Sequence, residues 1–186
     1  MPKLSSEHAM SRPFAADHAD VSPGSRLEIV QLMPAEWEQL SILRLAALRD
    51  SPETFLSTYD RESAFKLEEW ESEFKRGDWH AGRVGERFVS MMGVTREASM
   101  PFSQCYIEYM WVSPELRGLG VGRSMLAEVL AGLKRSGVET VFLWVLNGND
   151  IAVRLYEGMG FAKMNESQPI PNRPGRSEER MVLSLR

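Results

Sequence analysis

The sequence predicts an α/β fold built on a mixed sheet, in which parallel and antiparallel strands occur together. Residues 138–146 form a continuous apolar run, which is typical of a central strand buried on both faces. Residues 104–112 form a second strand-like run, and a glycine-rich turn and an amphipathic helix follow it. Strand, helix and strand in this order predict a β-α-β crossover between parallel strands.

Composition predicts one domain preceded by a tail. With 186 residues, of which 43% are hydrophobic, the chain can bury one good core. Residues 1–25 are rich in Ser, Ala, Pro and Asp and hold few large apolar side chains, so burial cannot offset the entropy of ordering them. We therefore expect a flexible tail at residues 1–25 and a single domain at residues 26–186.

The first part of the domain is predicted to hold a strand and two amphipathic helices. The strand covers residues 27–32, and the helices cover about residues 34–50 and 66–76. Pro34 suits a first helical turn, and Gly77 suits the stop of the second helix. The expected apolar faces are Trp37, Leu40, Leu43 and Ala47 in the first helix, and Leu67, Trp70 and Phe74 in the second.

Two strands near residues 80–84 and 88–95 come next, joined by a tight turn at Gly85-Glu86. After the glycine-rich turn, a helix that stops at Gly137 is expected to bury Val121, Met125, Leu126, Val129, Leu130 and Leu133.

The chain ends with a short helix and two strands. The helix is expected at residues 150–158 and the strands at residues 161–164 and 180–185. The segment between the strands, residues 169–176, is rich in turn-forming residues, and we expect it to be mobile.

Charge and hydropathy exclude two classes of partner. The formal net charge is −4, whereas nucleic-acid binding needs a strongly basic face. No apolar run approaches the ~18 residues that span a bilayer, and the start does not read as a signal peptide. The single cysteine, Cys105, excludes an internal disulfide framework. These features predict a cytoplasmic protein without nucleic-acid or membrane partners.

Residues 112–123 carry the clearest functional signal. Gly118, Gly120 and Gly122 lack a Cβ, which lets a ligand approach the main chain and leaves N–H groups uncovered. The next helix begins near Val121, and N–H groups at a helix start carry partial positive charge. The turn therefore predicts the binding of a phosphate or pyrophosphate.

Two familiar phosphate-binding loops do not match this turn. A nucleotide triphosphatase loop needs Gly-Lys followed by Ser or Thr, whereas the turn reads Gly122-Arg123-Ser124. A dinucleotide-binding loop needs G-x-G-x-x-G and an acidic residue at the end of the next strand. Here the spacing is G-x-G-x-G, and the next strand, residues 140–146, is followed by Asn147.

What remains is the pattern Arg117-x-x-Gly120-x-Gly122, with a second block at residues 149–161 that reads Asn-Asp-Ile-Ala-Val-Arg-Leu-Tyr-Glu-Gly-Met-Gly-Phe. Together the two blocks resemble the signatures of the GNAT superfamily of acyl-CoA-dependent N-acyltransferases. The resemblance is strong over about residues 108–161 and rests on element order elsewhere. It implies a mixed sheet of six to seven strands flanked by about four helices.

The same resemblance implies acetyl-CoA as cosubstrate, with its pyrophosphate on the glycine turn and its arm between two strands that splay apart. The strands would expose residues 110–112 and 146–149, and the N–H of Val112 would stabilise an oxyanion, an interaction worth ~3 kcal/mol. The implied cofactor-binding residues are Met110, Trp111, Val112, Arg117, Gly118, Leu119, Gly120, Val121, Gly122, Arg123 and Asn149.

Each of these roles has a structural alternative that the sequence leaves open. The glycines would also suit a tight strand-to-helix turn without any ligand. Arg123 would also suit a solvated helix surface, and Asn149 has an equally good reason to exist as a helix N-cap.

The resemblance implies Tyr156 as general acid, because a phenol can protonate the departing thiolate of CoA. Its alternative is a core aromatic. Glu108 is the candidate base that takes a proton from the amine, directly or through water. In a regular strand its side chain shares a face with those of Met110 and Val112. The alternative for Glu108 is a structural salt bridge.

Other catalytic chemistry has less support. Cys105 has no histidine near it in either motif, so we interpret it as inert packing. Three histidines, two of them in the tail, form no ligand cluster, and no metal is expected.

The amine acceptor is expected beside the first two helices, residues 51–63 and the segment 169–176. Acidic residues gather there and would attract a cationic amine, although such a run is more often a solvated helix face. They are Glu53, Asp60, Glu62, Glu68, Glu69, Glu71 and Glu73.

Two functions remain from the sequence. The first is acetyl transfer from acetyl-CoA to a primary amine by direct attack in a ternary complex, with a small-molecule amine favoured over a protein. The second is a non-catalytic acyl-CoA sensor or interaction module. A homodimer is an open alternative to a monomer.

Overall fold

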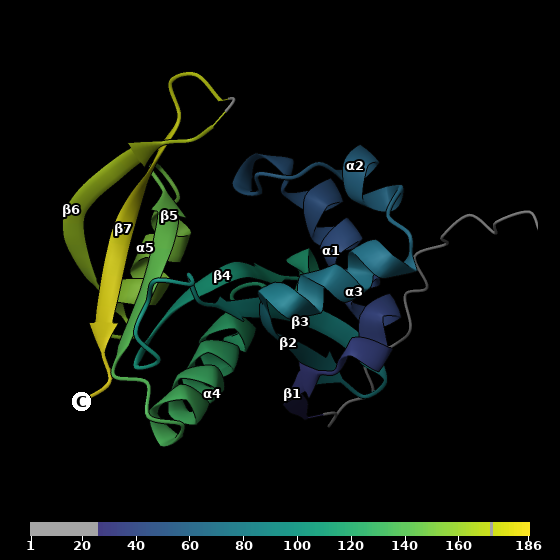
Figure 1. The fold of residues 1–186 in the computed structure, drawn as a ribbon, viewed down its shortest axis with the longest axis horizontal. Helices are drawn as coiled ribbons and strands as arrows, with labels where there is room; N and C mark the ends of the chain where they lie inside the picture. Colours follow the sequence, from purple (N-terminus) through teal and green to yellow (C-terminus); the bar gives the residue numbers. More distant parts are fainter. Residues whose placement is uncertain (1–25, 172) are drawn as a thin grey trace, which may run out of the picture.

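A seven-stranded mixed sheet forms the centre of the computed structural model, which describes residues 26–171 and 173–186 (Figure 1). The predicted flexible tail, residues 1–25, lies outside the described residues. The strand order is β1-β2-β3-β4-β5-β7-β6, and β4 and β5 are parallel whereas the other neighbours are antiparallel. The strands are β1 (Leu27–Leu32), β2 (Gly77–Val84), β3 (Arg87–Thr95), β4 (Gln104–Val112), β5 (Thr140–Leu146), β6 (Ala162–Pro169) and β7 (Ser177–Ser184).

Helices cover both faces of the sheet. The first face carries α4 (Val121–Arg135) and α5 (Asp150–Glu157), and the second carries α1 (Trp37–Asp50), α2 (Tyr59–Ser63) and α3 (Leu67–Arg76). Short 3-10 turns η1, η2 and η3 lie at Pro34–Glu36, Pro52–Thr54 and Pro114–Leu116. The predicted mixed sheet and the β4-α4-β5 crossover are confirmed. None of the helices in the described ranges is long and apolar enough to cross a bilayer.

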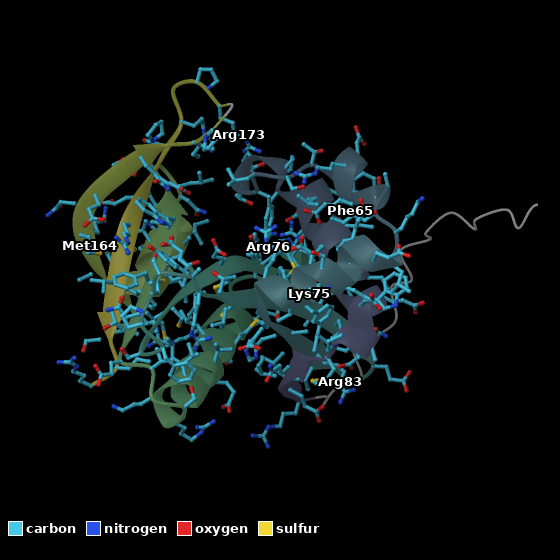
Figure 2. All side chains as sticks on the ribbon, in the orientation of Figure 1. Phe65, Lys75, Arg76, Arg83, Met164 and Arg173 are labelled. Atoms are coloured by element: carbon cyan, nitrogen blue, oxygen red, sulfur yellow. The ribbon has the colours of Figure 1, made fainter. Side chains whose placement is uncertain are left out.

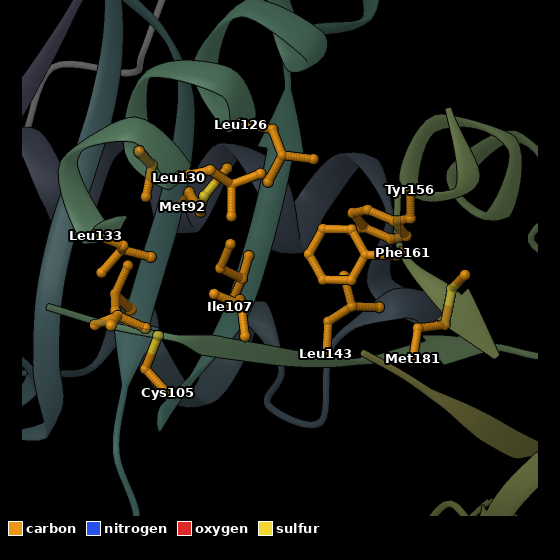
Figure 3. Close-up of a cluster of buried hydrophobic side chains, with 14 of the residues drawn as sticks. Met92, Cys105, Ile107, Leu126, Leu130, Leu133, Leu143, Tyr156, Phe161 and Met181 are labelled. Atoms are coloured by element: carbon orange, nitrogen blue, oxygen red, sulfur yellow. The ribbon is translucent and has the colours of Figure 1, made fainter. Parts of the chain in front are cut away.

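The core under α4 follows the predicted periodicity. All six apolar residues expected on the inward face of this helix are buried, and they pack on Met92 of β3, Cys105 and Ile107 of β4 and Leu143 of β5 (Figure 3). Tyr156 and Phe161 extend this core towards β7, with their ring centroids 5.8 Å apart. This packing holds the start of α4, and with it the glycine turn, against β4.

The core under α1 departs from the prediction in its second helix. Leu40, Leu43 and Ala47 are buried as expected, but Leu67 is 43% exposed, since it lies in the first turn of α3 at the molecular surface. As predicted, α3 ends at Gly77, which is its C-cap, but this glycine is not left-handed. It has an extended backbone (φ 174°) and is the first residue of β2, so that strand begins three residues earlier than expected.

The connection between α1 and α3 contains structure that the sequence did not predict. Residues 51–63 form η2 and the five-residue helix α2, and the side chain of Thr58 caps α2 by accepting from the N–H of Arg61. The last two strands are also longer than expected, so the turn between β6 and β7 is reduced to residues 170–176.

That turn is tied to the other side of the molecule. Figure 2 shows Arg173 on it, and its guanidinium donates to the carbonyls of Pro52, Glu53 and Phe55. The predicted acceptor-side elements, residues 51–63 and 169–176, therefore meet.

Candidate active site

The neighbouring strands β4 and β5 separate after three paired residues. Their pairing runs from Gln104 opposite Thr140 to Tyr106 opposite Phe142 and ends there. Both strands continue, β4 to Val112 and β5 to Leu146, so their C-terminal parts diverge (Figure 1). A groove of about 1320 Å³ occupies this gap and is lined by both strands, the glycine turn, α5 and the loops after α1.

A bulge in β4 decides which side chains face which side of the sheet. Gly93 of β3 is opposite Glu108 but Met91 is opposite Trp111, so β4 holds one extra residue, and Tyr109 takes a left-handed backbone (φ 58°). The alternation of side chains is therefore shifted after Glu108.

The predicted shared face of Glu108, Met110 and Val112 is consequently wrong. Met110 packs in the α4 and α5 core, whereas Tyr109 and Trp111 pack in the α1 core. Glu108 lies on the same side of the sheet as Trp111, because their partners Gly93 and Met91 are two residues apart in β3. The carboxylate and the Met110 side chain thus approach the groove from opposite faces.

The glycine turn presents main chain to the groove. Gly118 and Gly120 have φ values of 75° and 84°, and an added Cβ at either would meet nothing within 4 Å. Gly122 has a different role, because a Cβ there would lie 3.0 Å from Met110 Cε, so its absence lets α4 pack closely on β4. Within the described ranges, the N–H groups of residues 118 and 120–123 have no hydrogen-bond partner.

The backbone N–H of Val112 points into the gap. The N–H of the next residue, Ser113, donates to the carbonyl of Val89 in β3 at 2.8 Å. Successive residues of a strand direct their N–H groups to opposite sides, so the N–H of Val112 is directed away from β3 and towards the diverging β5. The Val112 carbonyl on the same side accepts from Arg117 Nε at 3.0 Å.

Arg117 lines the groove, and its guanidinium has a partner that the sequence did not predict. Its guanidinium forms an ion pair with Asp50, at the C-terminal end of α1, besides its contact with Val112. Asp50 also accepts from the indole of Trp111 at 2.9 Å. Burial raises the pKa of Asp50, but the hydrogen bonds from Ser51, Trp111 and Arg117 outweigh it and hold the pKa below its usual value. Sequence gave no sign of Asp50, which fixes the turn against α1.

The other predicted cofactor-binding side chains divide between groove and scaffold. Arg123 lines the groove while its guanidinium donates to the carbonyl of Gly158 at 3.2 Å, at the end of α5. Asn149 lines the groove as the N-cap of α5, accepting from the N–H of Ala152 at 3.2 Å. The Trp111 ring is buried in the α1 core. Leu119 is 71% exposed and is not among the groove-lining residues.

Tyr156 lies at the floor of the groove. Its ring is buried against Phe161, and its hydroxyl donates to the sulfur of Met110 at 3.7 Å. Burial raises the pKa of Tyr156 to about 12, so the phenol keeps its proton at every physiological pH. Tyr156 is therefore a core aromatic and also a groove residue, because its ring is buried while its hydroxyl faces the gap.

Glu108 lines the same groove as Tyr156. Its carboxylate accepts from the hydroxyl of Thr95 at 2.8 Å, and it takes part in no ion pair within the described ranges. Beside it, the hydroxyl of Tyr109 has no hydrogen-bond partner among the described residues. Burial raises the pKa of Tyr109, and the neighbouring Glu108 raises it further. Sequence reasoning missed Tyr109. What distinguishes this residue is its left-handed backbone, which the sequence does not reveal.

The acceptor end of the groove contains the predicted loops and some of the acidic residues. Glu53, Glu62 and Glu73 line it, whereas Glu68, Glu69 and Glu71 are exposed on α3 outside it. Glu62 carries no free charge, because it is buried in a two-bond ion pair with Arg44. The run of acidic residues is thus largely a solvated helix face.

The structure also shows where Cys105 and the residue types that bind metals lie. Cys105 is fully buried, and burial raises the pKa of its thiol to about 11, which makes it a poor nucleophile. In the part of the chain that is described, no three His, Cys, Asp or Glu side chains are placed to hold a metal ion.

Comparison with known proteins gives the family. The model of the acetyltransferase (GNAT) family matches residues 42–161. The chain belongs to the GNAT acetyltransferase family. Its glycine turn and its Asn149 to Phe161 block both lie inside the matched region. Acetyl-CoA is the cosubstrate used in this family, and the open glycine cradle with its unbonded N–H groups fits a pyrophosphate.

Individual relatives in the GNAT family are distant. Mycothiol acetyltransferase of Thermobispora bispora is 36% identical over 80 residues, which cover 43% of this chain and 26% of that protein. The ribosomal protein bS18 alanine N-acetyltransferase of Salmonella typhimurium is 28% identical over 116 residues, covering 58% of this chain and 78% of that protein. This chain thus matches only about a quarter of the mycothiol enzyme.

Solved GNAT structures share the fold. A probable acetyltransferase from Staphylococcus epidermidis superimposes with a TM-score of 0.69 at 13% identity, covering 87% of this chain and all of the other. At that identity the likeness establishes the arrangement of the elements and leaves the acceptor open.

Proposed function

We propose that this protein transfers an acetyl group from acetyl-CoA to a primary amine by direct attack in a ternary complex. One observation carries the proposal: the unbonded N–H groups of the glycine turn, the Tyr156 hydroxyl and the Glu108 carboxylate all line one groove where β4 and β5 part. The cosubstrate supplies the thioester carbonyl and a thiol leaving group. The curated relatives carry acetyltransferase names, which favours an enzyme over a sensor module.

The residues divide the work by position. N–H groups of residues 118 and 120–123 bind the pyrophosphate, and the N–H of Val112 stabilises negative charge that develops on the carbonyl oxygen. Tyr156 donates its proton to the departing sulfur. Its present partner is also a sulfur atom, that of Met110, so the hydroxyl already points where a thioether or thiol can accept.

Glu108 is the base in this proposal. An amine arrives mainly as ammonium and must lose a proton before it attacks. Because the bulge places Glu108 on the α1 face of β4, the amine would enter from that side while the thioester lies along the gap. The contact with Thr95 orients the carboxylate. A small-molecule amine is proposed as acceptor, and a cytoplasmic location stays a prediction.

The test is thiol release. Purified protein is mixed with acetyl-CoA and a panel of amines, free CoA thiol is followed, and the product is identified by mass. The proposal requires thiol release that depends on an amine, with a product 42 Da heavier than that amine, as an acetyl group replacing a proton demands. Binding of acetyl-CoA without amine-dependent release would instead indicate the sensor module.

A further inference from the structure

A second cavity adjoins the groove on the α1 side of the sheet. It has a volume of about 360 Å³ and lies between the C-terminal end of α3, the end of β3 and the middle parts of β4 and β5. Three residues, Arg76, Glu108 and Trp144, line both this cavity and the groove. The candidate base therefore stands at the junction of the two spaces.

Basic side chains line the second cavity without matching acidic partners. Lys75 and Arg96 form no ion pair in the described ranges, and the only pair of Arg76 there, with Glu73, is long at 3.5 Å. Figure 2 shows Lys75 and Arg76 next to each other at the end of α3. The lining carboxylates are Glu108 and the exposed Glu97, so cations outnumber anions by three to two.

Arg96 has an unused donor at this place. Its guanidinium stacks on the exposed ring of Phe102, 5.1 Å from the centroid, and its Nε atom is buried with no acceptor. A buried donor on a charged group is costly when it remains unbonded. The buried Nε atom is closed to a ligand, so a ligand oxygen in the cavity would be bound by the Nη groups of Arg96, which have no hydrogen-bond partner among the described residues.

Tyr106 supplies a second unused donor, and this side chain is almost wholly buried. It is 8% exposed and lines the cavity. Its oxygen accepts from Arg180 Nη2 at 2.7 Å, while its own proton has no acceptor among the described residues. Burial raises the pKa of Tyr106, which keeps it a donor. Arg180 also stacks on Phe142, 4.3 Å from the ring centroid, and its charge is compensated by an ion pair with Glu166 at 3.0 Å, so it holds the Tyr106 oxygen without adding net charge.

We propose that the second cavity binds an anionic group, a carboxylate or a phosphate, on the tail of the acceptor amine while the amine nitrogen lies at Glu108. Lys75, Arg76 and Arg96 supply the charge, and the Tyr106 hydroxyl supplies a neutral donor. The substrate class is therefore a small amino acid or amino phosphate. This inference depends on the proposed function, since it extends the acceptor site of the same reaction.

The experiment compares pairs of acceptors, one member anionic and one neutral at the tail, of which the carboxylate and carboxamide pair also has nearly the same size. Values of kcat/KM are measured by thiol release with 4-aminobutanoate against 4-aminobutanamide, and with 2-aminoethyl phosphate against 2-aminoethanol. We expect the anionic member of at least one pair to be preferred by about tenfold or more, as a charge-assisted contact implies. The pair that shows the preference identifies carboxylate or phosphate. Equal rates within both pairs would overturn the subsite.

Variants connect the preference to the cavity. Arg96→Gln and Tyr106→Phe should each reduce the ratio of kcat/KM between the anionic and the neutral acceptor, either about tenfold or to a value of one. Lys134→Gln, which removes an exposed charge from α4, should leave it unchanged. A preference that survives both cavity variants would contradict the proposal.

A binding measurement separates failure of the subsite from failure of the proposed function. Calorimetric titration of 4-aminobutanoate and of 2-aminoethyl phosphate, with CoA present, needs no turnover. Binding that Arg96→Gln weakens about tenfold supports the subsite even if no amine is acetylated. If neither anionic amine binds, or if Arg96→Gln does not weaken the binding, the subsite is overturned. The proposed function would still stand in that case if other amines support thiol release.

Discussion

The hydroxyl of Tyr156 donates to the sulfur of Met110 at the floor of the groove between β4 and β5, at 3.7 Å. Met110 reaches this position because the bulge at Tyr109 turns it towards α5, while Glu108 remains on the α1 face. One irregular residue in β4 thus separates the proposed acid from the proposed base and puts the groove between them. This relationship motivates the first prediction.

Replacing Tyr156 by Phe should lower kcat about 100-fold and leave CoA affinity within about twofold, because the ring packing is kept and only the proton donor is lost. Thiol release gives kcat and calorimetry gives affinity. An equal loss of both would show that the hydroxyl has a structural role instead.

The glycine turn can be tested with two glycines of the same backbone type. Gly120 (φ 84°) and Gly137 (φ 88°) both have open space around an added Cβ, but only Gly120 lines the groove. Either change to Ala should cost about 1–3 kcal/mol of unfolding free energy, because both glycines have a left-handed backbone that a residue with a Cβ adopts only with strain. Only Gly120→Ala should weaken CoA binding, by tenfold or more. Similar affinities in the two variants would contradict the cradle.

Glu108→Gln should lower kcat about 100-fold, because a neutral amide cannot accept the ammonium proton. Glu139→Gln is the matched control, since Glu139 pairs with Arg186 away from the groove. Thr95→Val should give a smaller loss, as it only frees the carboxylate to move. A Glu108→Gln enzyme within threefold of wild type would mean that a water chain ending elsewhere removes the proton.

Stability should depend on the buried ion pair between Arg44 and Glu62. Glu62→Gln leaves the Arg44 charge uncompensated at 4% exposure and should cost about 3 kcal/mol in urea unfolding. Glu28→Gln breaks a pair with Arg83 whose side chains are 40–56% exposed, and it should cost less than about 1 kcal/mol. Equal costs would show that Arg44 finds another partner.

His80 should make the fold less stable in mild acid. Burial lowers the pKa of His80 below its usual 6.5, with Asp78 acting in the opposite direction. Below about pH 6.5 the unfolded chain therefore binds a proton that the folded chain refuses, so stability falls as pH decreases. In His80→Gln this contribution disappears. Urea unfolding at pH 7.5 and 5.5 should show a smaller acid loss in the variant, and an equal loss would refute the assignment.

Much of the fold could be predicted because its signals are local. The 3.6-residue period predicted every buried position of α4, and the N-cap role that the sequence offered as one of two alternatives for Asn149 is confirmed. The bulge could not be predicted, since nothing in a run such as Ile107 to Trp111 marks one residue for a left-handed backbone. As a result, the strand was predicted correctly, but Glu108 was assigned to the wrong face of the sheet.

The role of Arg117 shows a second limit. The resemblance implies a place beside the pyrophosphate, and Arg117 does line the groove, but its ion-pair partner Asp50 could not be predicted, since it is 67 residues away in the sequence and adjacent only through packing. The short helix α2 was missed for a related reason, because five mostly polar residues carry no measurable period and are held by the buried contact of Glu62. Both the position of Arg117 and the presence of α2 depend on ion pairs between residues far apart in the sequence.

The most direct test of the account is a calorimetric comparison of CoA with pantetheine, made in the wild-type chain and in Gly120→Ala. Pantetheine has the same thiol arm but lacks the pyrophosphate and the 3′-phosphoadenosine, and the variant, whose CoA preference should shrink, isolates the part that the glycine turn contributes. If the N–H groups of residues 118 and 120–123 hold that diphosphate, CoA should bind at least 100-fold more tightly than pantetheine, roughly 3 kcal/mol. Equal affinity for the two ligands would contradict the central claim.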